Sequence, residues 1–282
     1  MRNTQRSQKI AFFLLFLATL LIVLPVGLIV VIIVQKGLPA INWQFLSDIP
    51  RQGMRTGGIF PAIIGTLYLV LGAVAFALPI GLLAAVYLSE YAKDNLLNRI
   101  IKLAIINLSG VPSVVYGLFG LALFVVFFKF GASILSGSLT LGIMILPIII
   151  TTSREALESV PQSFREVSLS LGASKWQTIR HIVLPNAIPG ILTGTILGLG
   201  RAAGETAPIL FTVAAFYLPR LPKSIFDQAM ALPYHLYVIS TQVPNVDEKM
   251  RYGTALVLLF LVLVMNLVAI IIRYNFRKKK KW

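Results

Sequence analysis

The sequence predicts an all-α membrane protein in which six helices cross the bilayer, and three observations support this fold class. Hydrophobic residues make up 57% of the 282-residue chain and charged residues only 12%, well below the ~25% of an average globular domain. The mean hydropathy is +0.85, and the apolar residues gather in six long runs. This composition excludes a soluble domain, an intrinsically disordered chain and a disulfide-stabilised scaffold. The absence of cysteine also excludes a cysteine-based metal site.

Each apolar run is long enough to cross the hydrocarbon core, which takes about 20 residues in an α-helix. The first run is longer than the ~7–15-residue core of a secretory signal peptide, and no small-residue cleavage site follows it. We therefore expect a retained signal-anchor helix there. The six predicted spans cover residues 10–34, 59–89, 103–128, 130–153, 187–218 and 252–272.

Lysine and arginine residues are distributed unevenly on the two sides of the predicted spans. Sixteen flank the side that carries both termini and the loops 90–102 and 154–186, and eight flank the opposite side. Because cytoplasmic flanks carry the excess of positive residues, both termini are predicted to be cytoplasmic. The net charge of +15 then reflects membrane topology rather than nucleic-acid binding, and the basic C-terminal tail is expected to contact anionic lipid.

Proline and glycine residues interrupt the predicted spans. Helix breakers are tolerated in lipid where neighbouring helices or a water-filled cavity satisfy the freed backbone groups. Gly190, Gly194 and Gly198 recur every four residues in the fifth span, which predicts the close approach of another helix. The prolines in or beside apolar runs are Pro25, Pro61, Pro79, Pro112, Pro147, Pro189 and Pro208.

Arg201 and Glu205 lie inside the fifth apolar run. Their spacing places them on one face of a helix, and each charge near the bilayer centre costs about 2.5–3.5 kcal/mol on insertion scales. They are therefore expected to pair or to line a wet cavity. One interpretation is a salt bridge that locks two spans. The other, which we favour, is a substrate pathway, because a guanidinium binds oxyanions and a nearby carboxylate weakens its grip enough for release.

The third apolar run contains a polar cluster around Pro112 that includes Ser109, Ser113 and Tyr116. Small hydroxyl groups beside a proline can line a passage with hydrogen-bond donors and free carbonyl groups. They can equally hold helices together, through bonds worth about 0.6 kcal/mol each. The sequence leaves both interpretations open.

The loop 154–186 has the pattern of two short amphipathic helices. Ser163 is predicted to cap a helix over 164–171, with Glu166 at the capping-box position. Gly172 is predicted to end this helix in a left-handed turn, and Pro185 is predicted to stop a second segment over 174–184. The pair either lies on the membrane surface or forms a projection that docks into a cytoplasmic partner.

The same loop resembles the EAA loop of ABC-importer permeases, whose pattern is E-A-A-x3-G-x9-I-x-L-P. Val167 and Ser168 replace the two alanines, which are packing positions. Further stretches, at 57–66, 107–124 and 200–212, resemble the phosphate-transport permeases of the PstA type, so the resemblance covers nearly the whole chain. The residues that it assigns to ATPase coupling are Glu166, Val167, Ser168, Gly172, Ala173, Ile182, Leu184 and Pro185.

The resemblance implies a type I ABC importer permease fold in a bacterial plasma (inner) membrane, with phosphate as the cargo and a transport role for Arg201 and Glu205. The implied partners are a homologous second permease subunit, ATP-binding subunits and an extracytoplasmic phosphate-binding protein. The expected domains are an N-terminal anchor and first outer loop at 1–58, a permease core at 59–273 and a basic cytoplasmic tail at 274–282.

The sequence carries no motif of a motor or an enzyme. It has no G-x-x-x-x-G-K-[ST] phosphate-binding loop, no H-E-x-x-H and no G-x-S-x-G. We therefore assign no catalytic residue, metal ligand or cofactor to this chain and expect ATP on partner subunits. The alternatives are a permease for sulfate, molybdate or a polyamine, a passive channel, and an intramembrane enzyme.

Two long segments on the outer side, 36–58 and 219–251, mix aromatic and charged residues. Interfacial aromatic side chains and snorkelling cations explain most of them. We also expect these segments to form a seat for the binding protein. The residues concerned are Trp43, Phe45, Arg51, Arg55, Arg220, Lys223, Tyr234, His235 and Tyr237.

Overall fold

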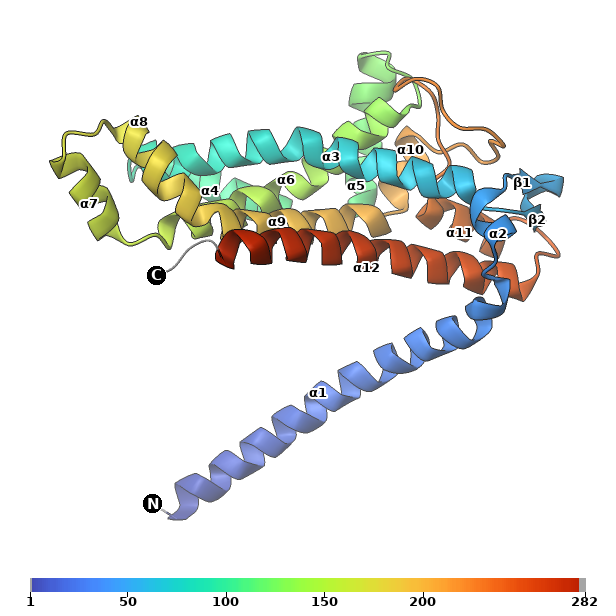
Figure 1. The fold of residues 1–282 in the computed structure, drawn as a ribbon, viewed down its shortest axis with the longest axis horizontal. Coiled ribbons are helices and arrows are strands. Elements are labelled where there is room, and N and C mark those ends of the chain that lie inside the picture. Colours follow the sequence, from blue (N-terminus) through green and yellow to red (C-terminus); the bar gives the residue numbers. More distant parts are fainter. Residues whose placement is uncertain (1, 279–282) are drawn as a thin grey trace.

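The computed structural model describes residues 2–278 and shows an almost entirely helical protein (Figure 1). Long helices run side by side, and short helices and one small hairpin cap the two ends of the bundle. Three of the helical segments, η3, η4 and η5, are π-helical turns. In chain order the elements are α1 (Arg2–Gly37), η1 (Leu38–Ala40), α2 (Trp43–Ser47), β1 (Pro50–Arg51), η2 (Gln52–Met54), β2 (Thr56–Gly57), α3 (Phe60–Val86), η3 (Tyr87–Tyr91), α4 (Leu96–Leu108), α5 (Ser113–Gly120), η4 (Leu121–Phe127), α6 (Ile134–Glu158), α7 (Gln162–Ser170), α8 (Lys175–Thr178), η5 (Ile179–Val183), α9 (Leu184–Gly204), α10 (Ala207–Thr212), α11 (Leu232–Thr241) and α12 (Glu248–Lys278).

The centre of the bundle is the pair α3 and α6. Helix α9 packs on α6, α12 packs on α9, and α1 leaves the bundle at an angle and contacts mainly α12 (Figure 1). The core follows the α3–α6 contact, where Leu69, Ala73, Leu141 and Ile145 are fully buried. Gly142 of α6 permits this contact, because a Cβ atom there would meet the Phe76 ring of α3.

The path of the chain is consistent with six membrane-spanning segments. Within residues 2–278, five helices are long and apolar enough to span a membrane, and α4 and α5 form a bent pair that passes the same test together. The C-terminal ends of α3 and α6 lie at the same end of the bundle, because Glu90, just after α3, pairs with Arg165, just after α6. The bent pair must therefore carry the chain back to the opposite end before α6 begins, and it forms the sixth span.

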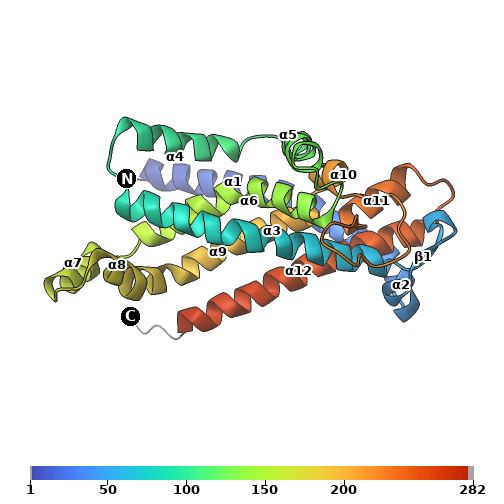
Figure 2. The same cartoon turned by 90° about the horizontal axis from the view of Figure 1, so that it is seen from above.

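The third predicted span is not the continuous helix expected over 103–128. Helix α4 ends at Leu108, α5 begins at Ser113, and their axes differ by 102° (Figure 2). Pro112 has no N–H to continue the helix and sits in an extended conformation with ψ 140°. The Tyr116 hydroxyl closes the bend by donating to the Leu108 carbonyl oxygen at 2.8 Å.

The fifth span differs from its prediction at both ends. Residues Lys175–Gly204 form one continuous helix, so Pro185 does not stop the segment over 174–184. The Leu184 N–H binds the Ile179 carbonyl oxygen five residues back, and this π-helical turn widens the helix just before the proline ring. At the far end, α9 stops at Gly204 rather than at residue 218. The chain there becomes extended at Glu205, and Pro208 lacks the N–H that would continue the helix.

The glycine row of α9 faces α6, as its spacing predicted. A Cβ atom at Gly190 would meet the Ala156 side chain, and one at Gly194 would meet the Thr152 side chain. Gly198 continues the row along the same contact. The two helix backbones approach closely because these positions carry no side chain.

The end of the bundle opposite α7 is built from segments 36–58 and 219–251, and part of this region belongs to the core. Phe45, Tyr234 and His235 are buried, so these three side chains do not line the expected seat for the binding protein, and the seat itself stays a prediction. Trp43 is 82% exposed and remains available on this surface. Helix α11 is fixed to α3 by the Leu232 N–H, which donates to the Thr66 hydroxyl at 2.8 Å.

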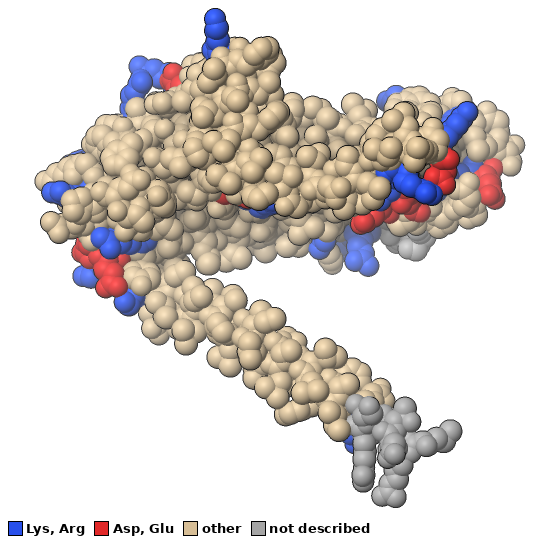
Figure 3. Space-filling view, turned by 180° about the vertical axis from the view of Figure 1, so that it is seen from behind, with Lys and Arg blue, Asp and Glu red and all other residues tan. Residues whose placement is uncertain are grey.

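Charged side chains gather at the two ends of the bundle, with a largely uncharged surface between them and along α1 (Figure 3). This distribution is the one expected of a chain that spans a bilayer. An ion pair of 2.8 Å between Lys36 and Glu248 joins the end of α1 to the start of α12. Residues 279–282 of the predicted lipid-binding tail lie outside the described residues.

Candidate functional site: transport pathway and coupling surface

Arg201 and Glu205 pair at the end of α9, although not on one helical face. Arg201 lies in the last turn of α9, whereas Glu205 is the first residue beyond the helix and has an extended backbone. Their charged atoms Nε and Oε1 are 3.7 Å apart, and the side chains are 31% and 18% exposed. This separation is longer than the roughly 2.7–2.9 Å of a tight charge-assisted hydrogen bond. The geometry therefore leaves the guanidinium accessible beside a loosely held carboxylate.

The break after α9 packs against the bend between α4 and α5. A Cβ atom at Gly117 of α5 would meet the Ala207 carbonyl oxygen and the Phe211 ring of α10. Tyr116, next to Gly117, is buried and lies within electrostatic range of Arg201. Helix α5 of the bent pair thus packs against α10, the segment that directly follows the Arg201–Glu205 pair, and broken helices of this kind commonly frame substrate and ion sites in membrane transporters.

The three polar residues of the third span occupy different parts of this bend. Ser109 caps the end of α4 and Ser113 begins α5, and both are half-buried. The Tyr116 hydroxyl donates to the Leu108 carbonyl oxygen, so at least this side chain serves the bend itself. Ser109 and Ser113 therefore flank the bend, and Tyr116 is the member of the cluster whose hydroxyl closes it.

The loop between α6 and α9 forms the expected projection, with two local differences. Helix α7 spans Gln162–Ser170 and its N-cap is Pro161, so the predicted cap at Ser163 is wrong. Proline at this position is preorganised by its fixed φ angle. Gly172 has a φ of +83°, which confirms the predicted left-handed turn. The capping box of this region belongs instead to α8, between Ser174 and Gln177.

One side of the projection is an apolar hollow of about 540 Å³, which we call the docking face. It contains four of the residues assigned to ATPase coupling. Leu184 and Pro185 lie deeper, on the helix that enters the bundle, and Glu166 is exposed outside the hollow. The docking face is lined by Phe164, Val167, Ser168, Leu171, Ala173, Ile182 and Asn186.

The docking face exposes large apolar side chains at one of the two charged ends of the molecule. Leu171 is 83% exposed and Val167 is 61% exposed. A hydrogen bond of 2.9 Å between the hydroxyls of Ser168 and Thr178 ties α7 to the helix that continues into α9. The projection is therefore an ordered apolar surface connected directly to a membrane-spanning helix.

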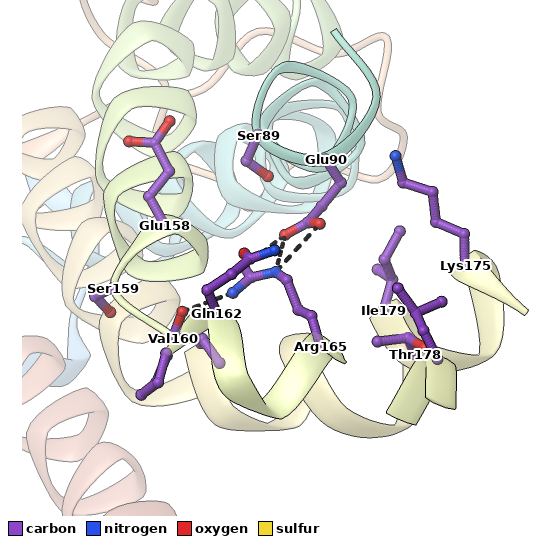
Figure 4. Close-up of a pocket in the computed structure, with 12 residues that line it drawn as sticks. Ser89, Glu90, Glu158, Ser159, Val160, Gln162, Arg165, Lys175, Thr178 and Ile179 are labelled. Carbon is purple, nitrogen blue, oxygen red and sulfur yellow. Dashed lines mark hydrogen bonds and ion pairs between the residues drawn. The ribbon is translucent and has the colours of Figure 1, made fainter. Parts of the chain in front are cut away.

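The base of the projection holds a largely buried ion pair that the sequence did not predict. Arg165 donates to the carboxylate of Glu90 at 2.7 Å, and the two side chains are 12% and 8% exposed. Figure 4 shows Arg165 reaching from α7 to the end of α3 across a cavity of about 590 Å³. The only sequence signal was an acidic residue at the end of an apolar run.

A membrane-spanning bundle with a polar break between its helices and an ordered apolar projection at one end has the architecture of a transport subunit. A family model described as the inner membrane component of binding-protein-dependent transport systems matches residues 77–282. The match covers more than half of the chain, and this protein therefore belongs to that family of ABC transporter permeases.

Relatives and solved structures agree with this assignment. The chain is 35% identical over 266 residues to the probable ABC transporter permease protein YqgI of Bacillus subtilis, covering 89% of this chain and 90% of the relative. It is 36% identical to the phosphate transport system permease protein PstA 1 of Mycobacterium tuberculosis, covering 80% and 72%. A bacterial alginate ABC transporter in complex with a periplasmic protein is similar in structure, with a TM-score of 0.64, 16% identity and coverage of 92% and 91%. The chain thus has the type I importer permease fold.

Proposed function

We propose that this chain is the permease subunit of an ATP-driven phosphate importer and forms half of its transmembrane pathway. The observation that carries the proposal is the exposed docking face, which is continuous with a spanning helix and so can couple a partner's motion to the pathway. The class of substrate is supported by relatives named as phosphate transport system permeases, one of which is 36% identical.

The pathway is proposed to pass the Arg201–Glu205 pair. A guanidinium presents planar N–H donors that match a phosphate oxyanion. The carboxylate of Glu205, 3.7 Å away, competes for the same donors and repels the anion. An alternating-access transporter needs this balance, because a site that binds too tightly cannot release its substrate to the other side.

Energy is proposed to come from separate ATP-binding subunits that seat on the docking face. Apolar side chains as exposed as Leu171 and Val167 are expected at a partner interface rather than at a solvated surface. Closure of two ATP-binding subunits would displace α7, and the continuous helix Lys175–Gly204 would carry the displacement towards Arg201.

A homologous second permease subunit is proposed to complete the pathway. Helix α1 leaves the bundle and exposes apolar side chains along its length, including Phe12, Leu21 and Ile29. A partner helix bundle, together with lipid, would cover this surface. An extracytoplasmic phosphate-binding protein would deliver the anion at the end that carries Trp43.

The proposed orientation places both termini and the docking face in the cytoplasm, in a bacterial inner membrane. Its support is the excess of sixteen over eight positive residues on that side. Modification of a cysteine introduced at Ser163 by a membrane-impermeant thiol reagent tests it. Labelling in inverted vesicles and protection in intact cells supports the orientation, and the reverse pattern contradicts it.

Substrate identity is tested by uptake in cells that express the chain with its proposed partners. Labelled phosphate is expected to accumulate, and excess unlabelled phosphate is expected to compete while sulfate, molybdate and a polyamine do not. If only one of these other solutes competes, the chain is still a permease of this class, but its substrate is that solute and not phosphate.

A further inference from the structure

Helix α7 is joined to the membrane bundle by surprisingly little packing. No residue of α7 is buried, and a cavity of about 590 Å³ separates its inner side from the ends of α3 and α6. Gln162, Arg165 and Leu169 of α7 line this cavity, and Arg165 reaches across it to Glu90 (Figure 4). The neighbouring turn η5 is anchored differently, because Ile179 and Val183 are fully buried in an apolar cluster with Ala85 and Leu157.

The Arg165 guanidinium binds three separate parts of the chain at once. Its Nη2 donates to the Glu90 carboxylate at 2.7 Å and to the Leu157 carbonyl oxygen at 2.9 Å. Its Nη1 donates to the Val160 carbonyl oxygen at 2.6 Å. Leu157 lies in the last turn of α6 and Val160 just beyond this helix, where the last carbonyl groups lack the N–H of a following helical turn.

Glu90 lies in the π-helical turn that ends α3. The ion pair therefore connects α7 to the end of α3, and the carbonyl contacts connect it to the end of α6. Because α3 and α6 form the central pair of the bundle, this joint reaches the structural centre of the membrane domain. The planar fork of arginine suits the task, since it holds several acceptors in fixed directions where a lysine would offer a single flexible ammonium.

We propose that the Arg165–Glu90 pair is the joint through which displacement of α7 is transmitted to α3 and α6. The inference rests on the proposed function, because it assumes that α7 is moved by an ATP-binding partner. Arg165 and Glu90 are positioning residues in this account and contact neither ATP nor the transported anion. Without the pair, α7 can move in its cavity while the central helices stay in place.

The test uses the assembled transporter in proteoliposomes and compares the wild type with Glu90→Gln and Arg165→Lys. The first variant removes the charge partner, and the second keeps the charge but loses the fork. We expect ATP hydrolysis to continue while phosphate transported per ATP falls at least roughly fivefold, the lower range of typical coupling between two sites. If Glu90→Gln does not assemble, the amount of phosphate transported per ATP by Arg165→Lys tests the proposal on its own.

A nearby ion pair supplies the matched control. Arg154 and Glu158 lie 3.7 Å apart at the end of α6, and Glu158 is 47% exposed. Because an exposed pair of this kind contributes little, Glu158→Gln is expected to leave the transport-to-ATP ratio unchanged. An equal fall in this control would show that the effect is not specific to the joint.

A second measurement follows the motion itself. The chain contains no cysteine, so spin labels can be placed at Ser163→Cys in α7 and Leu83→Cys in α3. In the labelled chain with Glu90 and Arg165 unchanged, nucleotide addition should leave the distance between the labels nearly constant, because the two helices move together. In Glu90→Gln the distance should change when nucleotide binds.

The outcomes separate this inference from the proposed function. A wild-type assembly without coupled uptake would overturn both. A coupled wild type with an equally coupled Glu90→Gln, or with no change in the label distance of that variant, would overturn the joint alone and leave the permease assignment standing.

Discussion

The Arg201 side chain is where the two interpretations of the intramembrane charges can be separated. A charge-assisted hydrogen bond contributes about 1.5–3 kcal/mol, so Arg201→Gln is expected to lower phosphate uptake by roughly ten- to a hundredfold. Glu205→Gln should have the opposite effect on binding, lowering the apparent KM because the competing carboxylate is gone, while release and turnover slow. Uptake kinetics in proteoliposomes measure both effects.

If the pair were only a lock between spans, the two variants would act alike. Each would lower the thermal stability of the assembled complex, and the two variants would not shift KM in opposite directions. Equal loss of stability with an unchanged KM would contradict the substrate-pathway interpretation. Arg201→Lys, which keeps the charge and loses the planar fork, should retain part of the uptake.

His235 in α11 predicts a pH dependence of stability. Burial lowers the pKa of His235 to about 4, and neither ring nitrogen has a hydrogen-bond partner among the described residues. The unfolded chain protonates this residue near pH 6.5, so stability present at neutral pH is lost as the pH falls from about 6.5 towards 4. The loss amounts to about 3 kcal/mol for this group.

Thermal unfolding of the detergent-solubilised protein at pH 7.5 and pH 5 measures this dependence. We expect His235→Phe to reduce the difference between the two pH values, because an apolar ring replaces a buried group that has no partner. His181 is exposed, so His181→Phe serves as the control and should leave the difference unchanged. An identical loss on acidification in the wild type and in His235→Phe would contradict the assignment.

Little of this residue-level detail could be read from the sequence. The Arg201–Glu205 pairing was predictable from the cost of charge in lipid, but the extended backbone at Glu205 was not. Glu90 and Arg165 are far apart in sequence and have no shared pattern. His235 resembled an interfacial residue until the fold placed it in the core.

The projection formed by α7 and α8 predicts a specific effect on assembly. Leu171 is 83% exposed, so Leu171→Glu should leave folding unchanged and put a charge into the proposed docking face. We expect binding of the ATP-binding subunits to weaken at least tenfold, since burying an unpaired carboxylate costs more than the ~1.4 kcal/mol of one decade. Co-purification and titration of the subunits measure the effect.

Leu38 provides the control at the opposite end of the bundle, where it is 61% exposed. Leu38→Glu adds the same charge to a similarly exposed site and should leave the affinity unchanged. Wild-type affinity in Leu171→Glu would contradict the position of the docking face.

Helices were more predictable than the breaks within them. Hydropathy located all six crossings, and the glycine row and Gly172 acted as their chemistry predicts. The effect of each proline on its helix was harder to predict, because it depends on tertiary contacts. Pro112 marks a bend of 102° that a Tyr116 hydrogen bond closes, whereas Pro185 follows a π-helical turn and does not interrupt its helix.

At the scale of the whole molecule, the spans are arranged around a central pair with one helix, α1, set apart. The sequence could not predict this arrangement, because every apolar run satisfies the same hydropathy criterion. The division into segments 1–58, 59–273 and 274–282 stays a prediction. Burial distinguishes the spans where composition does not, since α6 is mostly buried and α1 is exposed along its length.

We propose that the chain is a pathway without a motor of its own, driven through α7 by separate ATP-binding subunits. The most direct measurement reconstitutes the purified chain in liposomes alone, and then together with a second permease subunit and the ATP-binding subunits. We predict neither ATP hydrolysis nor uphill phosphate accumulation by the chain alone, and both by the full assembly with a binding protein present. ATP hydrolysis or uphill accumulation by the isolated chain would contradict the account.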